Sequence, residues 1–259
     1  MPLVETEDRG AVRHIVMTRA EKRNAMNGEL VLALDEAFKE AANDEAVRVV
    51  VVRGDGPMFS SGMDLGNLND LAGQAHRLRP FRAACIEAWN RLEEMPKPTI
   101  VQIHGAAIGG AMELALAADM RVMAEDAVAG LLETRIGLIP DVGGCSRLPA
   151  VVGVGIAKEL ILTGKVIGGE EAHRIGFANR IAPADELDAA TEALCNELLA
   201  CAPIAVGLAK RVIDSAAKPA LAQTLEQEVM AQTVCALSDD FAEGAQAFLG
   251  KRDPEFAGH

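Results

Sequence analysis

Short apolar runs alternate with amphipathic stretches along the first two-thirds of the chain. Runs rich in valine and isoleucine predict buried strands at residues 12–17, 47–53 and 99–103. Between the first two runs, apolar residues recur at helical spacing and predict a helix over residues 28–43. Strands that alternate with helices in this way indicate an α/β fold.

The next units follow the same pattern. Helical spacing predicts a long helix over residues 71–94, and Pro80 is expected to interrupt it, because proline removes a helical hydrogen bond. The pattern then predicts a helix over 109–118, a short strand over 121–124, helices over 149–163 and 169–175 with a turn between them, and a short strand over 177–181.

After Pro183 the chain becomes alanine-rich and helical, with segments predicted over 184–200, 203–215, 219–238 and 239–249. We therefore expect a core of residues 1–199 that holds the functional site, and a helical region of residues 200–259. This helical region has more apolar faces than one small core needs, so part of it is expected to bury against another subunit.

The composition and net charge of the chain restrict the classes of partner that it is expected to bind. The 259 residues are 50% hydrophobic, with seven phenylalanines, one tryptophan and no tyrosine, so base-stacking surfaces for single-stranded nucleic acid are not expected. The formal net charge of −13 would repel a phosphate backbone or an anionic membrane surface. We therefore expect neither a nucleic-acid partner nor a membrane partner, and an anionic ligand must meet a local basic cluster.

Cysteine usage and the N-terminus favour a reducing compartment. The five cysteines form no CxxC pair, which indicates neither a disulfide framework nor a zinc site. The opening MPLVETEDRGAV has early acidic residues and no apolar core, so no signal peptide is expected. No apolar run approaches the roughly 20 residues that cross a bilayer. A cytoplasmic location is the expectation.

Several common catalytic motifs are absent from the sequence. It contains no GxxxxGK[ST] loop, no strand-linked GxGxxG, no HExxH and no GxSxG, and its five histidines are scattered. No metal site is therefore predicted. Acid–base chemistry by carboxylates, with backbone N–H groups that stabilise an oxyanion, is the chemistry that remains.

Glu113 is the first candidate for that chemistry. Small and apolar residues flank it on both sides, and burial of an unpaired carboxylate is costly or raises its pKa. The preceding Gly109-Gly110 pair predicts a helix N-terminus, where backbone N–H groups bind negative charge. Gly110 would then offer an N–H group on the same face as Glu113. A helix-packing glycine pair with a salt-bridged glutamate fits this segment equally well.

Two further segments offer matching groups. The glycine-rich loop at 54–65 is thin enough for a ligand to approach its backbone, and Met63 could present an N–H group there, although an ordinary turn also fits. The apolar surroundings of Glu133 would raise its carboxyl pKa, unless it pairs with Arg135 or Arg147. Asp141, beside a second Gly-Gly pair, could simply cap the next helix.

Taken together, these segments resemble the enoyl-CoA hydratase/isomerase (crotonase) family. The resemblance runs nearly end to end, in order, and is carried by residues 18–27 (TRAEKRNAMN), 59–65 (FSSGMDL), 104–114 (HGAAIGGAMEL), 133–148 (ETRIGLIPDVGGCSRL) and 248–252 (FLGKR).

The resemblance implies a crotonase-like spiral of ββα turns with a helical C-terminal trimerisation region, as a homotrimer or a dimer of trimers. It implies an acyl-CoA thioester substrate, with no metal or redox cofactor, because coenzyme A is part of the substrate. The N–H groups of Met63 and Gly110 would form the oxyanion hole. Glu113 would deprotonate water for attack at C3, and Glu133 would deliver a proton to C2.

The resemblance also suggests coenzyme A contacts. Lys22 and Arg23 match positions near the nucleotide, and Lys251 would reach in from a neighbouring subunit. Backbone along the pantetheine path matches Ala25 and Ser61. The matching motifs add Asp64, Leu65 and Phe248 as contact residues. The acyl pocket is expected along residues 67–80.

Asp141 departs from the hydratase pattern. An acid at this position resembles the dienoyl-CoA isomerases, which shuttle protons across a dienoyl chain, but those enzymes match aspartate at the position of Glu113. A hydratase that adds water to a trans-2-enoyl-CoA is the favoured reading, because the paired glutamates carry the water chemistry. A dienoyl-CoA or enoyl-CoA double-bond isomerase is the alternative. A non-catalytic acyl-CoA-binding protein of the same fold is the third possibility.

Overall fold

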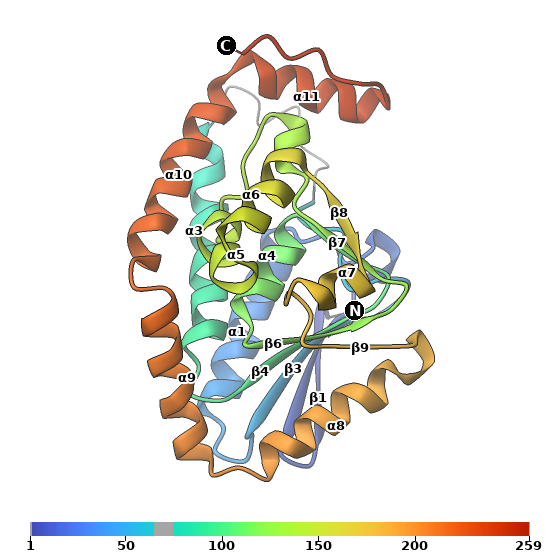
Figure 1. Cartoon of the computed structure of the whole chain (residues 1–259), viewed down its shortest axis with the longest axis vertical. Helices are drawn as coiled ribbons and strands as arrows, with labels where there is room; N and C mark the ends of the chain where they lie inside the picture. Colours follow the sequence, from blue (N-terminus) through green and yellow to red (C-terminus); the bar gives the residue numbers. More distant parts are fainter. Residues whose placement is uncertain (1, 65–74, 259) are drawn as a thin grey trace.

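A six-stranded sheet crosses the lower part of the molecule in the computed structural model, which describes residues 2–64 and 75–258 (Figure 1). β1 pairs antiparallel with β2, and every other pairing in this sheet is parallel. Its inner strands β3 and β4 are buried at nearly every position and rich in valine and isoleucine, as is typical of parallel sheets covered on both faces. In spatial order the strands are β1 (Val4–Arg9), β2 (Val12–Met17), β3 (Val49–Gly54), β4 (Thr99–Ile103), β6 (Met120–Ala124) and β9 (Arg180–Ala182).

A second, three-stranded sheet contains β5 (Ala106–Ile108), β7 (Val128–Gly130) and β8 (Val166–Gly168). The chain passes from β4 to β5 and then into helix α4 (Gly110–Ala117). It passes again from β6 to β7, through a short 3-10 helix, into α5 (Gly144–Val152). This repeated ββα turn between two sheets is the α/β architecture expected from the sequence.

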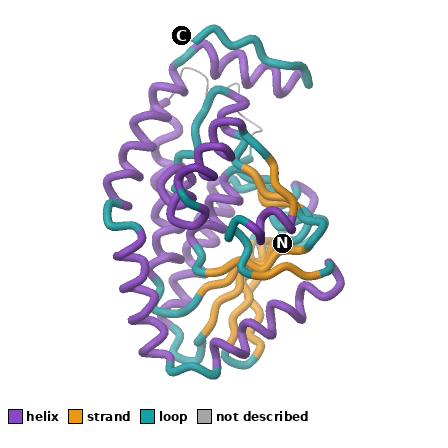
Figure 2. Tube along the Cα trace, viewed as in Figure 1, coloured by secondary structure: helices purple, strands orange, loops and turns teal. Residues whose placement is uncertain are grey.

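Helices cover the sheets (Figure 2). The packed pair α1 (Gly28–Asn43) and α3 (Ala75–Glu94) buries side chains that include Phe38 and Trp89. α1 begins where the Asn27 side chain accepts a hydrogen bond from the Leu30 amide at 3.0 Å. The remaining helices of residues 154–199 are α6 (Val154–Thr163), α7 (Gly169–Arg174) and α8 (Leu187–Leu199).

Several predicted elements differ from the structure. α3 continues through Pro80, so the predicted break is wrong; the helix is held by buried residues beyond the proline, such as Cys85 and Trp89. The predicted helix over 149–163 is two helices, α5 and α6, which separate at Gly153 with φ +82°. Part of the predicted turn between residues 164 and 169 is strand β8.

Three helices form the C-terminal region: α9 (Pro203–Ala217), α10 (Leu221–Leu237) and α11 (Asp239–Gly250). α9 and α10 run along one side of the molecule, and α11 crosses its top (Figure 1). The predicted boundary near residue 200 falls in the loop between α8 and α9.

α11 packs closely on the 3-10 helix η3 (Glu133–Ile136). A Cβ atom on Gly137 would lie 2.8 Å from the Asp240 carbonyl oxygen, and one on Gly244 would lie 2.6 Å from the Ile136 carbonyl. Glycine at both positions lets the two backbones approach, so the last helix closes over the segment that carries Glu133.

No single helix of residues 2–64 and 75–258 is long and apolar enough to span a membrane. Among these residues, one pair of helices, 184–199 and 203–217, has the necessary length and composition when taken together, but the two helices meet at a bend of 104°.

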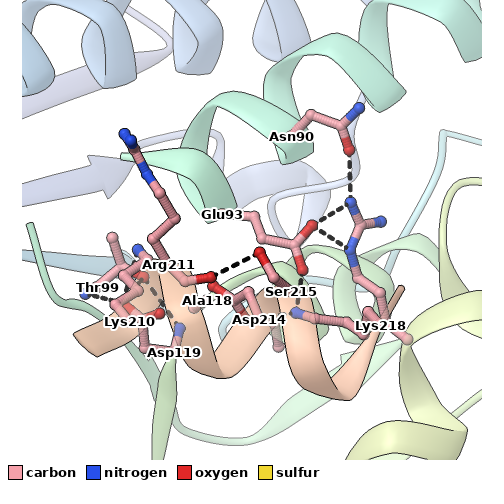
Figure 3. Close-up of polar contacts among 12 residues, drawn as sticks. Asn90, Glu93, Thr99, Ala118, Asp119, Lys210, Arg211, Asp214, Ser215 and Lys218 are labelled. Atoms are coloured by element: carbon pink, nitrogen blue, oxygen red, sulfur yellow. Dashed lines mark hydrogen bonds and ion pairs between the residues drawn. The ribbon is translucent and has the colours of Figure 1, made fainter. Parts of the chain in front are cut away.

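A buried charge network joins α3, α5 and α9 (Figure 3). Glu93 accepts hydrogen bonds from Arg147 at 2.8 and 3.0 Å and pairs with Lys218. Arg147 has no solvent exposure, and its guanidinium also donates to the Asn90 side chain at 2.6 Å. Burial opposes ionisation of Glu93, yet the two cations outweigh burial and lower its pKa. The network therefore fixes α9 to the helices beneath it.

We predict that Glu93→Gln lowers the free energy of unfolding by about 3 kcal/mol, because it leaves the buried Arg147 without a counter-charge. Glu94→Gln, at the exposed neighbouring position, should change it little. Urea denaturation followed by circular dichroism measures both. Equal effects of the two substitutions would mean that the network does not stabilise the fold.

Candidate active site

Three segments distant in sequence meet beside β5. The Phe59 amide donates to the His104 carbonyl at 2.9 Å, and the Ser60 amide donates to the Ala106 carbonyl at 3.0 Å. On its other edge the loop pairs with Met26, whose amide donates to the Gly62 carbonyl at 2.8 Å. The loop that carries Met63 is therefore held between β5 and the segment after η1 (Ala20–Lys22).

Glycines allow this close approach. Gly62 has φ +94°, and a Cβ atom there would collide with the Ile108 carbonyl oxygen. A Cβ atom on Gly110 would lie 2.9 Å from Cγ of Met63. The structure therefore brings Met63 and Gly110 side by side, as the sequence predicted.

The amide N–H groups of these two residues are available as donors. Gly110 begins α4, where first-turn amides lack a helical acceptor. The neighbouring Gly62 carbonyl and Asp64 amide both bond to Met26, so the Met63 amide points the other way along the loop. Neither amide donates a hydrogen bond to a protein acceptor within residues 2–64 and 75–258. Two free donors at one place can stabilise an oxyanion.

Glu113 lies in the first turn of α4 and is only 2% exposed. Its Oε1 accepts hydrogen bonds from the amides of Val142 at 3.0 Å and Gly144 at 2.8 Å. No ion pair to Glu113 is found in the described part of the chain, so backbone donors take the place of the salt bridge considered above. Burial raises the pKa of Glu113 well above the ordinary glutamate value; the charges of Glu133 and Glu228 add to this, and the two amides oppose it.

Glu133 faces α4 from η3. A Cβ atom on Gly109 would lie 2.8 Å from Oε1 of Glu133, so glycine at 109 leaves room for the carboxyl group. Oε2 of Glu133 is buried and has no hydrogen-bond partner among the described residues. Burial raises the pKa of Glu133 to about 7.

The cations considered as partners of Glu133 are engaged elsewhere. Arg147 pairs with Glu93, and Arg135 lies against the Thr163 carbonyl at 3.4 Å. Glu133 thus combines a raised pKa with an unpartnered oxygen, as expected of a proton donor at neutral pH.

Asp141 does not cap α5. The residue at the helix N-cap is Gly143, and no side chain caps it. Asp141 instead forms an ion pair with Arg82 of α3, which is 4% exposed. Burial lowers the pKa of Arg82 to about 10. The structure therefore places Asp141 next to the site with its charge compensated by a buried guanidinium.

The sequence analysis missed Glu228 of α10. Its carboxylate accepts hydrogen bonds from the Gly143 amide at 2.8 Å and from the Ser146 amide and hydroxyl at 2.6 Å each. Gln232, one helical turn later, accepts from the Ile139 amide at 2.9 Å. Two polar side chains four residues apart on one helix face were the only signal in the sequence, and that signal is too common to identify partners.

The predicted coenzyme A contacts lie in two places. Ser61 donates its amide to the Arg23 carbonyl at 2.9 Å, and Arg19 bonds both the Ala25 carbonyl, at 2.7 Å, and Asp64, at 2.6 Å. Residues 19–25 and 61–64 therefore form one continuous surface beside the Met63 amide. Its exposed cationic side chains are Lys22 and Arg23.

Phe248 and Lys251 are exposed at the end of α11, and no hydrogen bond joins them to Lys22 or Arg23 among the described residues. Leu65 and most of the expected acyl-pocket segment, residues 67–74, lie outside the described residues.

Metal ligands do not cluster in the described chain: residues 2–64 and 75–258 contain no group of three or more His, Cys, Asp or Glu side chains that could hold a metal ion. The five cysteines are free.

Comparison with known proteins agrees with this geometry. Residues 7–259 match the model of the enoyl-CoA hydratase/isomerase family. The human mitochondrial enoyl-CoA hydratase domain-containing protein 2 is 39% identical over 95% of this chain and 86% of its own length. The crotonyl-CoA hydratase of Syntrophomonas wolfei is 32% identical over 98% of this chain and 96% of its own length.

Among solved structures, an enoyl-CoA hydratase from Mycobacterium avium subsp. paratuberculosis K-10 matches with a TM-score of 0.89 and 27% identity, over 98% of both chains. The crotonase-like fold expected from the motifs is confirmed.

We predict that, in a protein labelled with ¹³C at glutamate carboxyls, one carboxyl signal titrates at about pH 7 because burial disfavours the charged form of Glu133. This titration should vanish in Glu133→Gln and persist in Glu125→Gln, an exposed control. A full set of signals that titrate near the ordinary value of 4.5 would show that Glu133 is solvated.

Proposed function

The chain belongs to the enoyl-CoA hydratase/isomerase family, and we propose that it adds water to trans-2-enoyl-CoA thioesters to give 3-hydroxyacyl-CoA. One observation carries this proposal. Glu113, bonded by two backbone amides, and Glu133, with an unpartnered oxygen, converge next to the free amides of Met63 and Gly110.

Protonation of the two carboxyls differs by environment. Burial raises the pKa of both carboxyl groups, and the charge of Glu133 raises the pKa of Glu113 further, so ionisation of one group affects the other. The amides of Val142 and Gly144 stabilise the charged form of Glu113. In the proposed mechanism Glu113 is therefore the base, and Glu133 carries the proton and is the acid.

Hydration uses both groups. Glu113 takes a proton from water as the water oxygen bonds to C3, and the electrons of the double bond move toward the thioester oxygen. The N–H groups of Met63 and Gly110 stabilise the resulting enolate oxygen. Glu133 then delivers its proton to C2, which completes a syn addition. Transfer of the proton from Glu113 to the now ionised Glu133, directly or through solvent, restores the starting state.

The position of Asp141 favours hydration over double-bond isomerisation. An isomerase would need this carboxyl group to exchange protons with the substrate, whereas its ion pair with Arg82 stabilises the charged form. A non-catalytic acyl-CoA-binding role is disfavoured because both glutamates are buried, which is costly unless they serve the chemistry.

The rest of the proposed complex follows from charge and exposure. On the surface formed by residues 19–25 and 61–64, Lys22 and Arg23 supply positive charge for the coenzyme A phosphates. Ala25, Ser61 and Asp64 lie beside them. No separate cofactor is proposed, because coenzyme A is part of the substrate. A cytoplasmic location is part of the proposal.

We also propose a homotrimer or a dimer of trimers. α9 and α10 expose large apolar side chains, with Ile204 78% and Val234 73% exposed. Patches of this kind mark protein interfaces. In such an assembly Phe248 and Lys251 of a neighbouring subunit would complete the coenzyme A site.

We predict that Glu113→Gln and Glu133→Gln each lower kcat for hydration of a short trans-2-enoyl-CoA by about 10²–10⁴-fold, the usual contribution of one acid–base group. Loss of the conjugated thioester absorbance measures the rate. Glu125→Gln should retain wild-type activity, and all variants should keep the circular dichroism of the parent.

Product analysis on enoyl-CoA and dienoyl-CoA substrates distinguishes the alternatives. A wild-type protein that converts dienoyl-CoA without water uptake and leaves every enoyl-CoA unchanged would be an isomerase. Tight acyl-CoA binding without turnover would identify a binding protein.

For the assembly, light scattering after size-exclusion chromatography should give three or six times the chain mass of 27.3 kDa. A charge at the α9 face, in Ile204→Asp, should shift the protein to smaller species, because it would be buried unpaired at the interface. Leu32→Asp, at an exposed apolar position of α1, is the matched control. A monomeric wild-type protein would refute the proposed assembly.

A further inference from the structure

The turn at residues 142–146 gives its backbone amides to two different carboxylates. Glu113 receives the amides of Val142 and Gly144, and Glu228 receives those of Gly143 and Ser146. The amides of residues 142, 143 and 144 thus alternate between a group from α4 and a group from α10. Any movement of one carboxylate changes the position of the amides that hold the other.

Burial and hydrogen bonds to both carboxylate oxygens hold the side chain of Glu228 in place. It is 4% exposed, and its Oε1 accepts from both the amide and the hydroxyl group of Ser146, while Oε2 accepts from Gly143. Two of these donors are amides that cannot act as acceptors, so the arrangement fits an ionised carboxylate rather than a carboxylic acid. Burial raises the pKa of Glu228, and the donors and the charge of Arg147 oppose that rise.

We propose that Glu228 is a positioning residue for the acid–base pair: from the C-terminal helix it holds the turn that binds Glu113 and places a fixed negative charge behind that base. The proposal rests on the proposed function for its kinetic readout only, because the geometry and the titration of the carboxyls are independent of any substrate.

Other charged and titratable groups surround this cluster. Arg147 of α5 attracts Glu228, but Glu93 of α3 already compensates its charge. Cys145, also on α5, has its pKa raised to about 12 by burial and by the nearby carboxylates, so it stays neutral. Further groups of the described chain nearby are Glu113 of α4, Glu133 of η3, Cys85 of α3, whose pKa is raised by burial, and Asp141 with its partner Arg82.

The sign of the effect follows from the charges. Burial is the largest cause of the raised pKa of Glu113, and the negative charges of Glu133 and Glu228 add to it. Removal of the Glu228 charge should therefore lower the pKa of Glu113. Because Glu113 acts in its ionised form, the acidic limb of the pH profile of kcat/KM should move to lower pH.

The central experiment compares Glu228→Gln with Glu226→Gln, which removes an exposed charge from the same helix. We expect the acidic limb to move down by roughly half a pH unit or more in the first variant, as expected for interacting sites. The second variant should match the wild type. The same shift should appear in the ¹³C titration of the Glu113 carboxyl, without substrate.

Glu228→Asp distinguishes the effect of the negative charge from the effect of side-chain length. It keeps the negative charge but shortens the side chain, so kcat should fall while the acidic limb stays near that of the wild type. A purely structural role would instead lower activity at every pH in both variants and leave the limb and the Glu113 titration unshifted, which would overturn the proposal.

Ser146→Ala provides a test that does not require substitution of Glu228. It removes one donor from the Glu228 carboxylate, which should raise the pKa of Glu228 and thereby weaken its charge. The Glu113 titration should then move in the same direction as in Glu228→Gln but less far. An unchanged Glu113 titration would contradict the proposal. If the protein shows no hydratase activity, this carboxyl titration still decides it.

Discussion

The amides of Val142 and Gly144 hold a carboxylate that has almost no contact with water. Removal of such a group from solvent costs several kcal/mol, and hydrogen bonds to a charged group return about 1.5–3 kcal/mol each. The turn must therefore keep its shape for Glu113 to remain both buried and ionisable. Gly143, at φ +120°, makes this shape possible, since a Cβ atom there would collide with the guanidinium of Arg147.

The C-terminal helices are part of the site rather than an appendage to it. α10 binds the backbone of the turn through Glu228 and the preceding Ile139 amide through Gln232, and α11 closes over η3. α9 is tied by Lys218 to Glu93 and so to Arg147, which donates to the Val142 carbonyl at 3.2 Å. The stability of the C-terminal helices and the geometry of the proposed acid–base pair, Glu113 and Glu133, therefore depend on the same buried polar contacts.

Much of the core was predictable because its apolar pattern is strong. The helix over residues 28–43 and the strands at 12–17 and 99–103 were predicted with the observed bounds, since continuous burial requires continuous apolar runs. β5, β7 and β8 have only three residues each, too few for a periodic signal. Pro80 was misjudged because local propensity yields to the burial of residues beyond it.

The residues of the site likewise fall into those that the sequence could predict and those that it could not. Apolar flanks and glycines mark Glu113, Glu133, Met63 and Gly110 as candidates, and the resemblance to the family favoured them over the ordinary alternatives. The ion pair of Asp141 with Arg82 and the contacts of Glu228 join segments far apart in the sequence. The spacing of residues along the sequence does not predict such contacts, because the packing of whole helices determines which polar groups meet.

The paired glycines between η3 and the last helix have an evolutionary consequence. Gly137 makes room for the α11 backbone, and Gly244 makes room for the backbone next to Gly137. A larger residue at either position would push the same two segments apart, and at position 137 it would also strain the backbone, because Gly137 has φ +75°. Descendants of this gene in which α11 has moved away from η3 should therefore lose the need for glycine at 244 but keep glycine at 137.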